Sequence, residues 1–287
     1  MESVGLLQTA ATVLLNSAFG WLAGTLYCAH CLRHNAAHRS TVDTLWRSSA
    51  WAALACLCAS FTVLLCALAL MGDVGLGEAL GMLPQMLRDT AYGRAGLGGL
   101  LAIGLLMVLC AAGRRWLLPA ALLLMVFALT RASISHAGEN GLLTVGTAIE
   151  WAHLALAGLW IGVVAVAGWI VLPAAHGQGS SLRPFLGAVS SAATLALAGV
   201  VLSGLYNAWQ RIASVEQMLT HPYGNALGVK LVLVGIAVGM GAYNRLHGFP
   251  AAPQRPRRAI LVLRIESAVL LGALLAAALL TLQEPPR

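Results

Sequence analysis

Eight stretches of this sequence are almost continuously apolar, and each is long enough to cross a lipid bilayer as an α-helix. A helical span needs about 20 predominantly apolar residues. The strands of a membrane barrel would instead alternate between polar and apolar residues, and these stretches do not. The predicted spans are residues 4–29, 48–71, 95–112, 116–134, 146–172, 185–208, 226–243 and 260–282. The pattern therefore predicts an all-α, polytopic membrane helix bundle with about eight transmembrane helices.

The breaks between these stretches, and the glycines within them, predict local turns and helix packing. Gly113 and two arginines separate the third and fourth stretches and predict a tight hairpin. Residues 80–87 lie in a long break and predict a short interfacial helix. Glycine pairs at four-residue spacing let membrane helices approach closely. The pairs expected to mark such contacts are Gly20 and Gly24, Gly158 and Gly162, and Gly235 and Gly239.

Composition and charge support a membrane protein and predict its orientation. Of the residues, 59% are hydrophobic and 9% are charged, whereas soluble domains carry about 25% charged residues. The net charge of +7 is concentrated in the odd-numbered connections, which predicts that these stay in the cytoplasm and that both termini face outward. The placement argues against nucleic-acid binding. Arg131 is expected in an outer connection. The first apolar run is too long for a signal-peptide core, so a retained first span is expected.

Residues that can bind a metal gather around the outer end of the fifth predicted span. His136 and Glu139 precede the span, and Glu150 and His153 lie three residues apart inside it, on one helix face. Ionisable residues within a span are costly and by default mark a functional site. Imidazole suits copper, and thioether sulfur favours Cu(I). The predicted metal ligands at this level are His136, Glu150, His153, Met218 and His221.

Two alternatives stay open for this outer cluster. Each histidine can instead form a hydrogen bond with a neighbouring backbone group. Glu150 can be a ligand, or it can orient an imidazole without touching the metal.

A second set of possible ligands lies at the inner end of the first span. Cys28 and Cys31 are three residues apart, and His34 follows three residues later. If the helix continues beyond the bilayer, His30, His34 and His38 share one of its faces. Thiolate and imidazole would hold Cu(I) or Zn(II), although the spacing matches no standard zinc motif. The alternative is that the cysteines fill space, since small buried cysteines usually pack as apolar residues.

Two further expectations concern charge pairing and catalysis. Arg245 and Glu266 both fall toward the inner leaflet, and pairing them would neutralise two costly charges. The sequence contains no phosphate-binding loop, nucleophile elbow, zinc-protease motif or dinucleotide fingerprint. The protein is therefore not expected to be an enzyme.

Several motifs in the second half resemble the CopD family of bacterial copper-resistance inner-membrane proteins. Together they cover about residues 130–266, whereas the first half resembles the family only as a bundle of hydrophobic helices. The domain division expected from this resemblance is one membrane domain of residues 1–287, with four N-terminal helices in 1–129 and a CopD-like core in 130–282. The matching segments are residues 135–138, 150–162, 202–208 and 222–224, Lys230, residues 241–245, Arg264 and Glu266.

The resemblance implies a multi-pass protein of the bacterial inner membrane that takes part in copper homeostasis and copper resistance. Members of the family are generally assigned to copper tolerance or import, often with a periplasmic copper carrier as partner. The expected ligand is a copper ion, bound on the periplasmic side and passed toward the cytoplasm. By position, the family's histidine motifs fall on His136 and His153, whereas a histidine at His221 is not expected of the family.

Two other functions remain open from the sequence. One is a haem-binding or electron-transferring helix bundle, since imidazoles can be axial ligands of haem. His153 lies well inside a predicted span, and no other histidine does. A haem would therefore need a second axial ligand from a loop, such as His136 or His221. The other is an assembly or sensing partner for a periplasmic copper protein.

Overall fold

The structure is a computed structural model that describes residues 2–135, 138, 141, 144–175, 182–210, 222–252 and 254–280, without the side chains of residues 222–226 and 280. Within these residues, eight helices are long and apolar enough to cross a membrane, and there is no strand. The long helices are α1 (Glu2–Leu32), α2 (Arg39–Gly72), α4 (Ala91–Ala112), α5 (Leu117–Ser133), α6 (Val145–Val166), α8 (Arg183–Trp209), α10 (Pro222–Tyr243) and α12 (Pro256–Leu280). The predicted all-α bundle of about eight spans is confirmed.

Short helical segments connect or extend the long helices. They are η1 (Ala36–His38), α3 (Leu76–Asp89), η2 (Arg114–Trp116), η4 (Ala167–Val171), α7 (Leu172–Ala174), η5 (Asn244–Gly248) and α11 (Phe249–Ala251). The hairpin between the third and fourth spans is confirmed, because Gly113 turns the chain with a φ of 95° before η2 begins. The short helix predicted at residues 80–87 is also confirmed, as the central part of α3.

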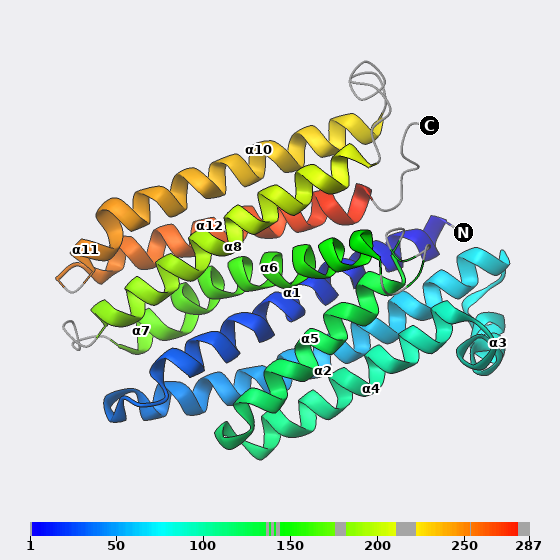
Figure 1. The fold of residues 1–287 in the computed structure, drawn as a ribbon, viewed down its shortest axis with the longest axis horizontal. Helices are drawn as coiled ribbons and strands as arrows, with labels where there is room; N and C mark the ends of the chain where they lie inside the picture. Colours follow the sequence, from blue (N-terminus) through cyan, green and yellow to red (C-terminus); the bar gives the residue numbers. More distant parts are fainter. Residues whose placement is uncertain are drawn as a thin grey trace.

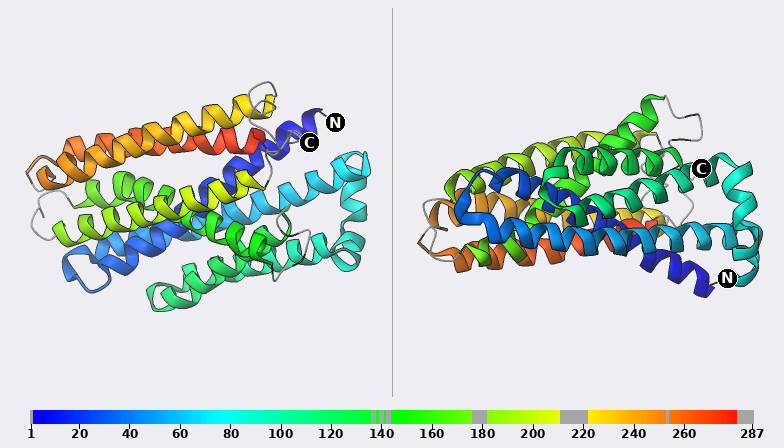
Figure 2. Two further views of the ribbon diagram at one scale, coloured as in Figure 1. Left: turned by 45° about the horizontal axis from the view of Figure 1, so that its top comes forward. Right: turned by 90° about the horizontal axis from the view of Figure 1, so that it is seen from below.

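The long helices run side by side in one bundle (Figure 1). Helices α10 and α12 lie at one edge and α4 with α5 at the other, while α1 and α6 pass between them (Figures 1 and 2). Helix α1 begins at the same end of the bundle at which α12 ends, and α3 lies across that end (Figure 1). We call this end the outer end, after the orientation predicted from charge, and the opposite end the inner end.

Helices α1 and α6 cross with their backbones in contact, and glycine makes this crossing possible. A Cβ atom added at Gly24 would overlap the backbone of Gly162, and one added at Gly162 would overlap the backbone of Gly20 and Gly24. One added at Gly158 would overlap the ring of Phe19. The predicted pairs on these two helices are therefore confirmed as a close helix contact.

The third glycine pair behaves differently from this prediction. Cβ atoms added at Gly235 and Gly239 of α10 would meet nothing within 4 Å. The prediction that this pair marks a helix contact within the chain is therefore wrong. Residue spacing alone does not say which face of a helix meets a neighbour, and this face of α10 points away from the bundle.

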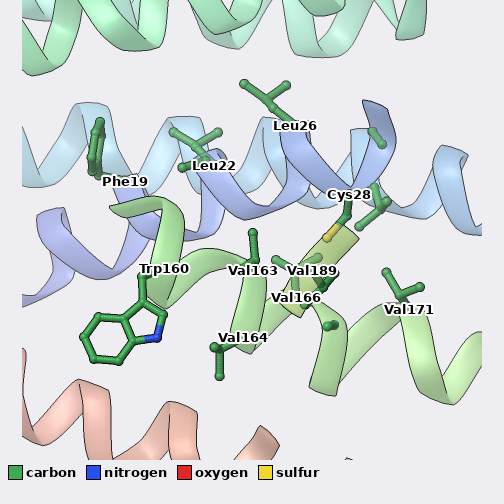
Figure 3. Close-up of a cluster of buried hydrophobic side chains, with 14 of the residues drawn as sticks. Phe19, Leu22, Leu26, Cys28, Trp160, Val163, Val164, Val166, Val171 and Val189 are labelled. Atoms are coloured by element: carbon green, nitrogen blue, oxygen red, sulfur yellow. The ribbon is translucent and has the colours of Figure 1, made fainter. Parts of the chain in front are cut away.

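The centre of the bundle is filled by apolar side chains from α1 and α6. Figure 3 shows side chains of this buried cluster, including Phe19 and Leu22 of α1 and Trp160 and Val163 of α6. Leu22 and Val163 are fully buried, and the other two are almost fully buried. This apolar layer separates a polar cluster toward the outer end from another toward the inner end.

Two π-helical segments, η4 and η5, widen the helices near the inner end, and each is followed closely by a proline. Pro173 comes after η4, and Pro250 comes after η5. A proline within a helix has no N–H to donate, and its ring collides with the carbonyl group four residues earlier. Those carbonyl groups belong to Trp169 and Leu246, inside the two π segments. The wider turn relieves the collision, and such segments often occur at functional sites.

Candidate metal centre

His153 lies in the third turn of α6 and is held in one orientation by α8. Its Nδ1 atom lies 2.8 Å from the hydroxyl oxygen of Ser203. That hydroxyl group donates its single proton to the carbonyl oxygen of Gly199, one turn earlier on α8. The ring must therefore donate its Nδ1 proton to Ser203. In this tautomer Nε2 carries the lone pair, and it is the ring atom that can coordinate a metal.

Glu150, one turn before His153 on α6, is also held by α8. The side-chain amide of Asn207 donates a hydrogen bond of 2.7 Å to Oε2 of Glu150. The neighbouring Trp151 fixes α6 against α5, because its indole nitrogen donates to the carbonyl oxygen of Met125 at 3.0 Å. Glu150 and His153 thus face α8 together, as their three-residue spacing predicts.

Arg131 adds a positive charge to this cluster from the last turn of α5. One of its nitrogens donates to the side-chain oxygen of Asn16 on α1 at 2.7 Å, and its guanidinium carbon lies 5.9 Å from the centre of the Phe19 ring. It also lies within electrostatic range of Glu150. The expectation that Arg131 belongs to an outer connection is wrong, because its side chain turns back into the bundle. The one feature of the sequence that could have indicated this inward direction was the position of Arg131 at the end of an apolar run.

Arg131 and Glu150 place opposite charges within electrostatic range of each other, in surroundings where charge is expensive. We expect Glu150→Gln to lower the free energy of unfolding by roughly 1–3 kcal/mol, because it leaves the Arg131 guanidinium without its nearby acid. Chemical unfolding of the detergent-solubilised protein measures this change. The double variant Arg131→Gln/Glu150→Gln should be more stable than Glu150→Gln alone, and Glu78→Gln, on an exposed side chain of α3, serves as the control.

The other residues predicted for the outer cluster cannot be placed. His136, Glu139, Met218 and His221 lie outside the described residues. Within the part of the chain that is described, no three His, Cys, Asp or Glu side chains come together as a metal site. A complete outer site therefore needs ligands from the two connections to which these residues belong, and their participation stays a prediction.

At the inner end, the structure separates the residues of the predicted cysteine and histidine stripe. Cys28 is fully buried, and Figure 3 shows it near Val163, Val166 and Val189. Helix α1 ends at Leu32, so the continuous helical stripe expected through His34 and His38 does not form.

The remaining inner residues have other partners nearby. Cys31 is half-buried and lies near the hydroxyl group of Tyr27. His34 is exposed, and its Nε2 accepts a hydrogen bond of 2.9 Å from Arg33. Metal binding by Cys28, Cys31 and His34 stays a prediction, and it would require these side chains to move.

The expected ion pair between Arg245 and Glu266 is not formed. Arg245 donates instead to the hydroxyl oxygen of Thr194 on α8 at 2.7 Å. Glu266 is 2% exposed, and its Oε2 has no hydrogen-bond partner. Arg245 lies in the π-helical segment η5, and its side chain is directed to α8, where Thr194 accepts its hydrogen bond.

Comparison with protein families matches both halves of the chain. The family described as Copper resistance protein D matches residues 183–280, and the Copper resistance protein D-like N-terminal domain matches residues 1–145. The second match corrects the expectation that the first half resembles the family only as a hydrophobic bundle. Glu150 and His153 lie between the two matched ranges. No curated protein and no solved structure matches.

The two matched ranges together include seven of the eight helices that are long and apolar enough to span a membrane. The N-terminal match alone covers just over half of the 287 residues. The chain therefore belongs to the copper resistance protein D family and is a multi-pass membrane protein.

Proposed function

We propose that this protein binds copper near the outer end of the bundle and passes it toward the cytoplasm across the bacterial inner membrane. The family supports a role in copper resistance. The observation that carries the proposal is the fixed orientation of His153, whose Nδ1 donates to Ser203. Ligating histidines almost always donate their other ring N–H in this way, which fixes the ring and the tautomer.

Copper would be held by His153 through Nε2, together with ligands from the two outer connections. His136, His221 and Met218 supply the imidazole and thioether groups that copper prefers. Glu150 would act mainly by orienting the site, because Asn207 and the nearby Arg131 already compensate its charge. A periplasmic copper carrier would deliver the ion by ligand exchange at these connections.

Inward movement would end at the thiol groups of Cys28 and Cys31, which favour Cu(I). Between His153 and these cysteines, α6 presents the apolar layer around Val163. Transfer across this layer would need the helices to move relative to one another. The sequence contains no nucleotide-binding motif, so the flux would follow a gradient or a carrier. In this role the protein would be a transporter without catalytic residues.

The orienting role of Ser203 can be tested directly. Ser203→Ala is expected to weaken copper binding by about 10–100-fold, the range found when the partner of a ligating histidine is removed. Titration of the purified protein with Cu(I) under a competing chelator measures the affinity. Ser191→Ala, which changes an exposed serine on the same helix, should leave the affinity unchanged. An unchanged affinity in Ser203→Ala would argue against His153 as a ligand.

A further inference from the structure

A cavity of about 210 Å³ lies in the inner half of the bundle, between α6, α8, α10, η5 and α12. Its lining is mainly apolar, including Trp160 and Leu263. Among the lining residues described, the polar side chains belong to Ser190, Thr194, Asn244, Arg245 and Glu266. The cavity lies apart from the outer cluster of Glu150 and His153, and the function proposed above does not use it.

Two buried side chains at this cavity carry polar atoms without a hydrogen-bond partner. Asn244 is fully buried, and neither its side-chain oxygen nor its nitrogen forms a hydrogen bond. Glu266 is 98% buried by the same measure, and its Oε2 is likewise unpaired. Leaving such groups unpaired costs free energy. In a folded protein each therefore points to a bound water, a bound ligand or a functional role.

Glycines lie next to both side chains and leave room for them. A Cβ atom added at Gly248 would overlap Oδ1 of Asn244, and one added at Gly241 would lie 3.3 Å from Oε1 of Glu266. Asn244 also begins the π-helical segment η5, and the π segment η4 packs against α12, which carries Glu266. Glycines and widened turns thus surround these two polar groups.

Within the described part of the chain, no cation is paired with the Glu266 carboxyl group. Arg245 lines the same cavity, but it is bound to Thr194. Arg264 is turned the other way, where it donates to the carbonyl oxygen of Gly168 at 3.2 Å and lies 4.6 Å from the Trp169 ring. A carboxylate buried without a counter-ion is costly, and a carboxyl group in such surroundings takes up a proton instead.

Among the described residues that line the cavity, Arg245 is the one titratable group besides Glu266. The lining residues of α6, α8 and α10 do not titrate. On η5, His247 is exposed and stacks on Tyr243. On α1, Tyr27 donates to the carbonyl oxygen of Ala188 and does not line the cavity.

The residues that line this cavity are better suited to bind a proton than a metal ion. The cavity-lining residues described include no His, Cys or Met, so the soft ligands that copper prefers are missing. A hard cation would need several oxygen ligands, whereas Glu266 supplies the one carboxyl group among the described residues that line the cavity. A proton needs one carboxyl oxygen, and the Asn244 amide can accept a hydrogen bond from the protonated group.

A second cavity of about 370 Å³ lies beside the first one. It is lined by Arg183, Gly187 and Pro250, and it shares Ser190, Arg245 and Phe249 with the first cavity. Since Arg183 begins α8 at the inner end, we expect protons to reach Glu266 from that side.

We propose that Glu266 is a proton-binding site, that Asn244 is the hydrogen-bond partner of its protonated carboxyl group, and that the site exchanges protons with the inner side. The site gives the protein a means of linking proton movement to copper movement, and this second part rests on the proposed function. Intramembrane carboxyl groups serve as proton relays in pumps and transporters.

Infrared difference spectroscopy of the full-length protein in detergent tests proton binding without copper. At neutral pH the wild type should show the carbonyl stretch of a protonated carboxyl group, sensitive to exchange into D₂O. This band should disappear in Glu266→Gln and remain in Glu78→Gln, which changes an exposed carboxyl group. The proposal is overturned if the wild type lacks the band, or if the band survives in Glu266→Gln.

A second variant keeps the test decisive if Glu266→Gln does not fold. Asn244→Leu retains the carboxyl group and removes its proposed partner, so the band should remain but shift in frequency. An unshifted band would exclude Asn244 as the partner.

Copper uptake into proteoliposomes under an imposed pH gradient tests the coupling. The wild-type rate should respond to the gradient, and Glu266→Gln should lose this response while still binding copper. A retained response would overturn the coupling. If the wild type takes up no copper at all, the proposed function fails, whereas the infrared result stands by itself.

Discussion

Replacing His153 with alanine is expected to lower copper affinity by more than about 100-fold, because loss of a partner that merely orients a ligand already costs about 10–100-fold. The effect should be large because the ring is preorganised: Ser203 fixes its tautomer, so no ordering cost is needed when the ion arrives. Metal analysis and Cu(I) titration of the purified protein measure the change. Copper accumulation in cells that produce the variant should fall in parallel.

The matched control is His247→Ala, which removes an exposed imidazole near the inner end. Its copper affinity should equal that of the wild type. The double variant His136→Ala/His153→Ala should lose no more than His153→Ala if the two rings share one ion, since the site is already disrupted. Undiminished binding in His153→Ala would refute the site. A Soret absorption band in the wild-type preparation would favour the haem alternative.

Replacing Gly162 with leucine is expected to prevent formation of the native bundle. The added side chain would enter the backbone of α1 at Gly20 and Gly24, and backbone atoms cannot turn aside as a flexible side chain can. Overpacking usually costs about 1–3 kcal/mol and occasionally more. The free-energy cost of separating the two central helices should be larger than this. It should approach the total stability of about 5–15 kcal/mol that is typical of proteins.

The yield of monodisperse protein after detergent extraction, followed by thermal unfolding, measures this effect. Gly235→Leu is the matched control, because the same substitution there meets nothing within 4 Å. It should give a yield and a melting temperature close to those of the wild type. Equal losses in both variants would mean that leucine is harmful at any of these glycines, and that the crossing of α1 and α6 is not the cause.

The sequence predicted the positions of the helices correctly, but it did not predict which side chains contact each other between helices. The eight spans follow from apolar length, which is a local property, and the hairpin at Gly113 follows from a local interruption. The facing of Glu150 and His153 also follows from helix geometry within one segment. The stripe through His34 and His38 failed because α1 ends at Leu32, and the other failures concern relations between helices. Gly235 and Gly239 have the same spacing as Gly158 and Gly162, yet they face away from the bundle.

For the charged residues, too, the sequence indicated the local position but not the contact between helices. Arg131 was expected in a connection and Arg245 in an ion pair, because a sequence gives the position of a charge but not the direction of a long side chain. The structure turns Arg131 inward to Asn16 and directs Arg245 to Thr194, so Glu266 is left without a cation. These directions depend on where the last turn of α5 ends and on the π segment η5.

The sequence by itself determined the class of protein, the number of spans, the candidate ligands His153 and Glu150, and the resemblance to a copper-resistance family, because each depends on residue type and spacing along one chain. Only the tertiary structure decided that Ser203 and Asn207 hold those ligands, that Arg131 balances their charge, and that Asn244 and Glu266 share a cavity. The physical reason is that hydrogen bonds and charge compensation inside a bilayer are formed between helices far apart in sequence. Their partners are fixed by how the helices cross.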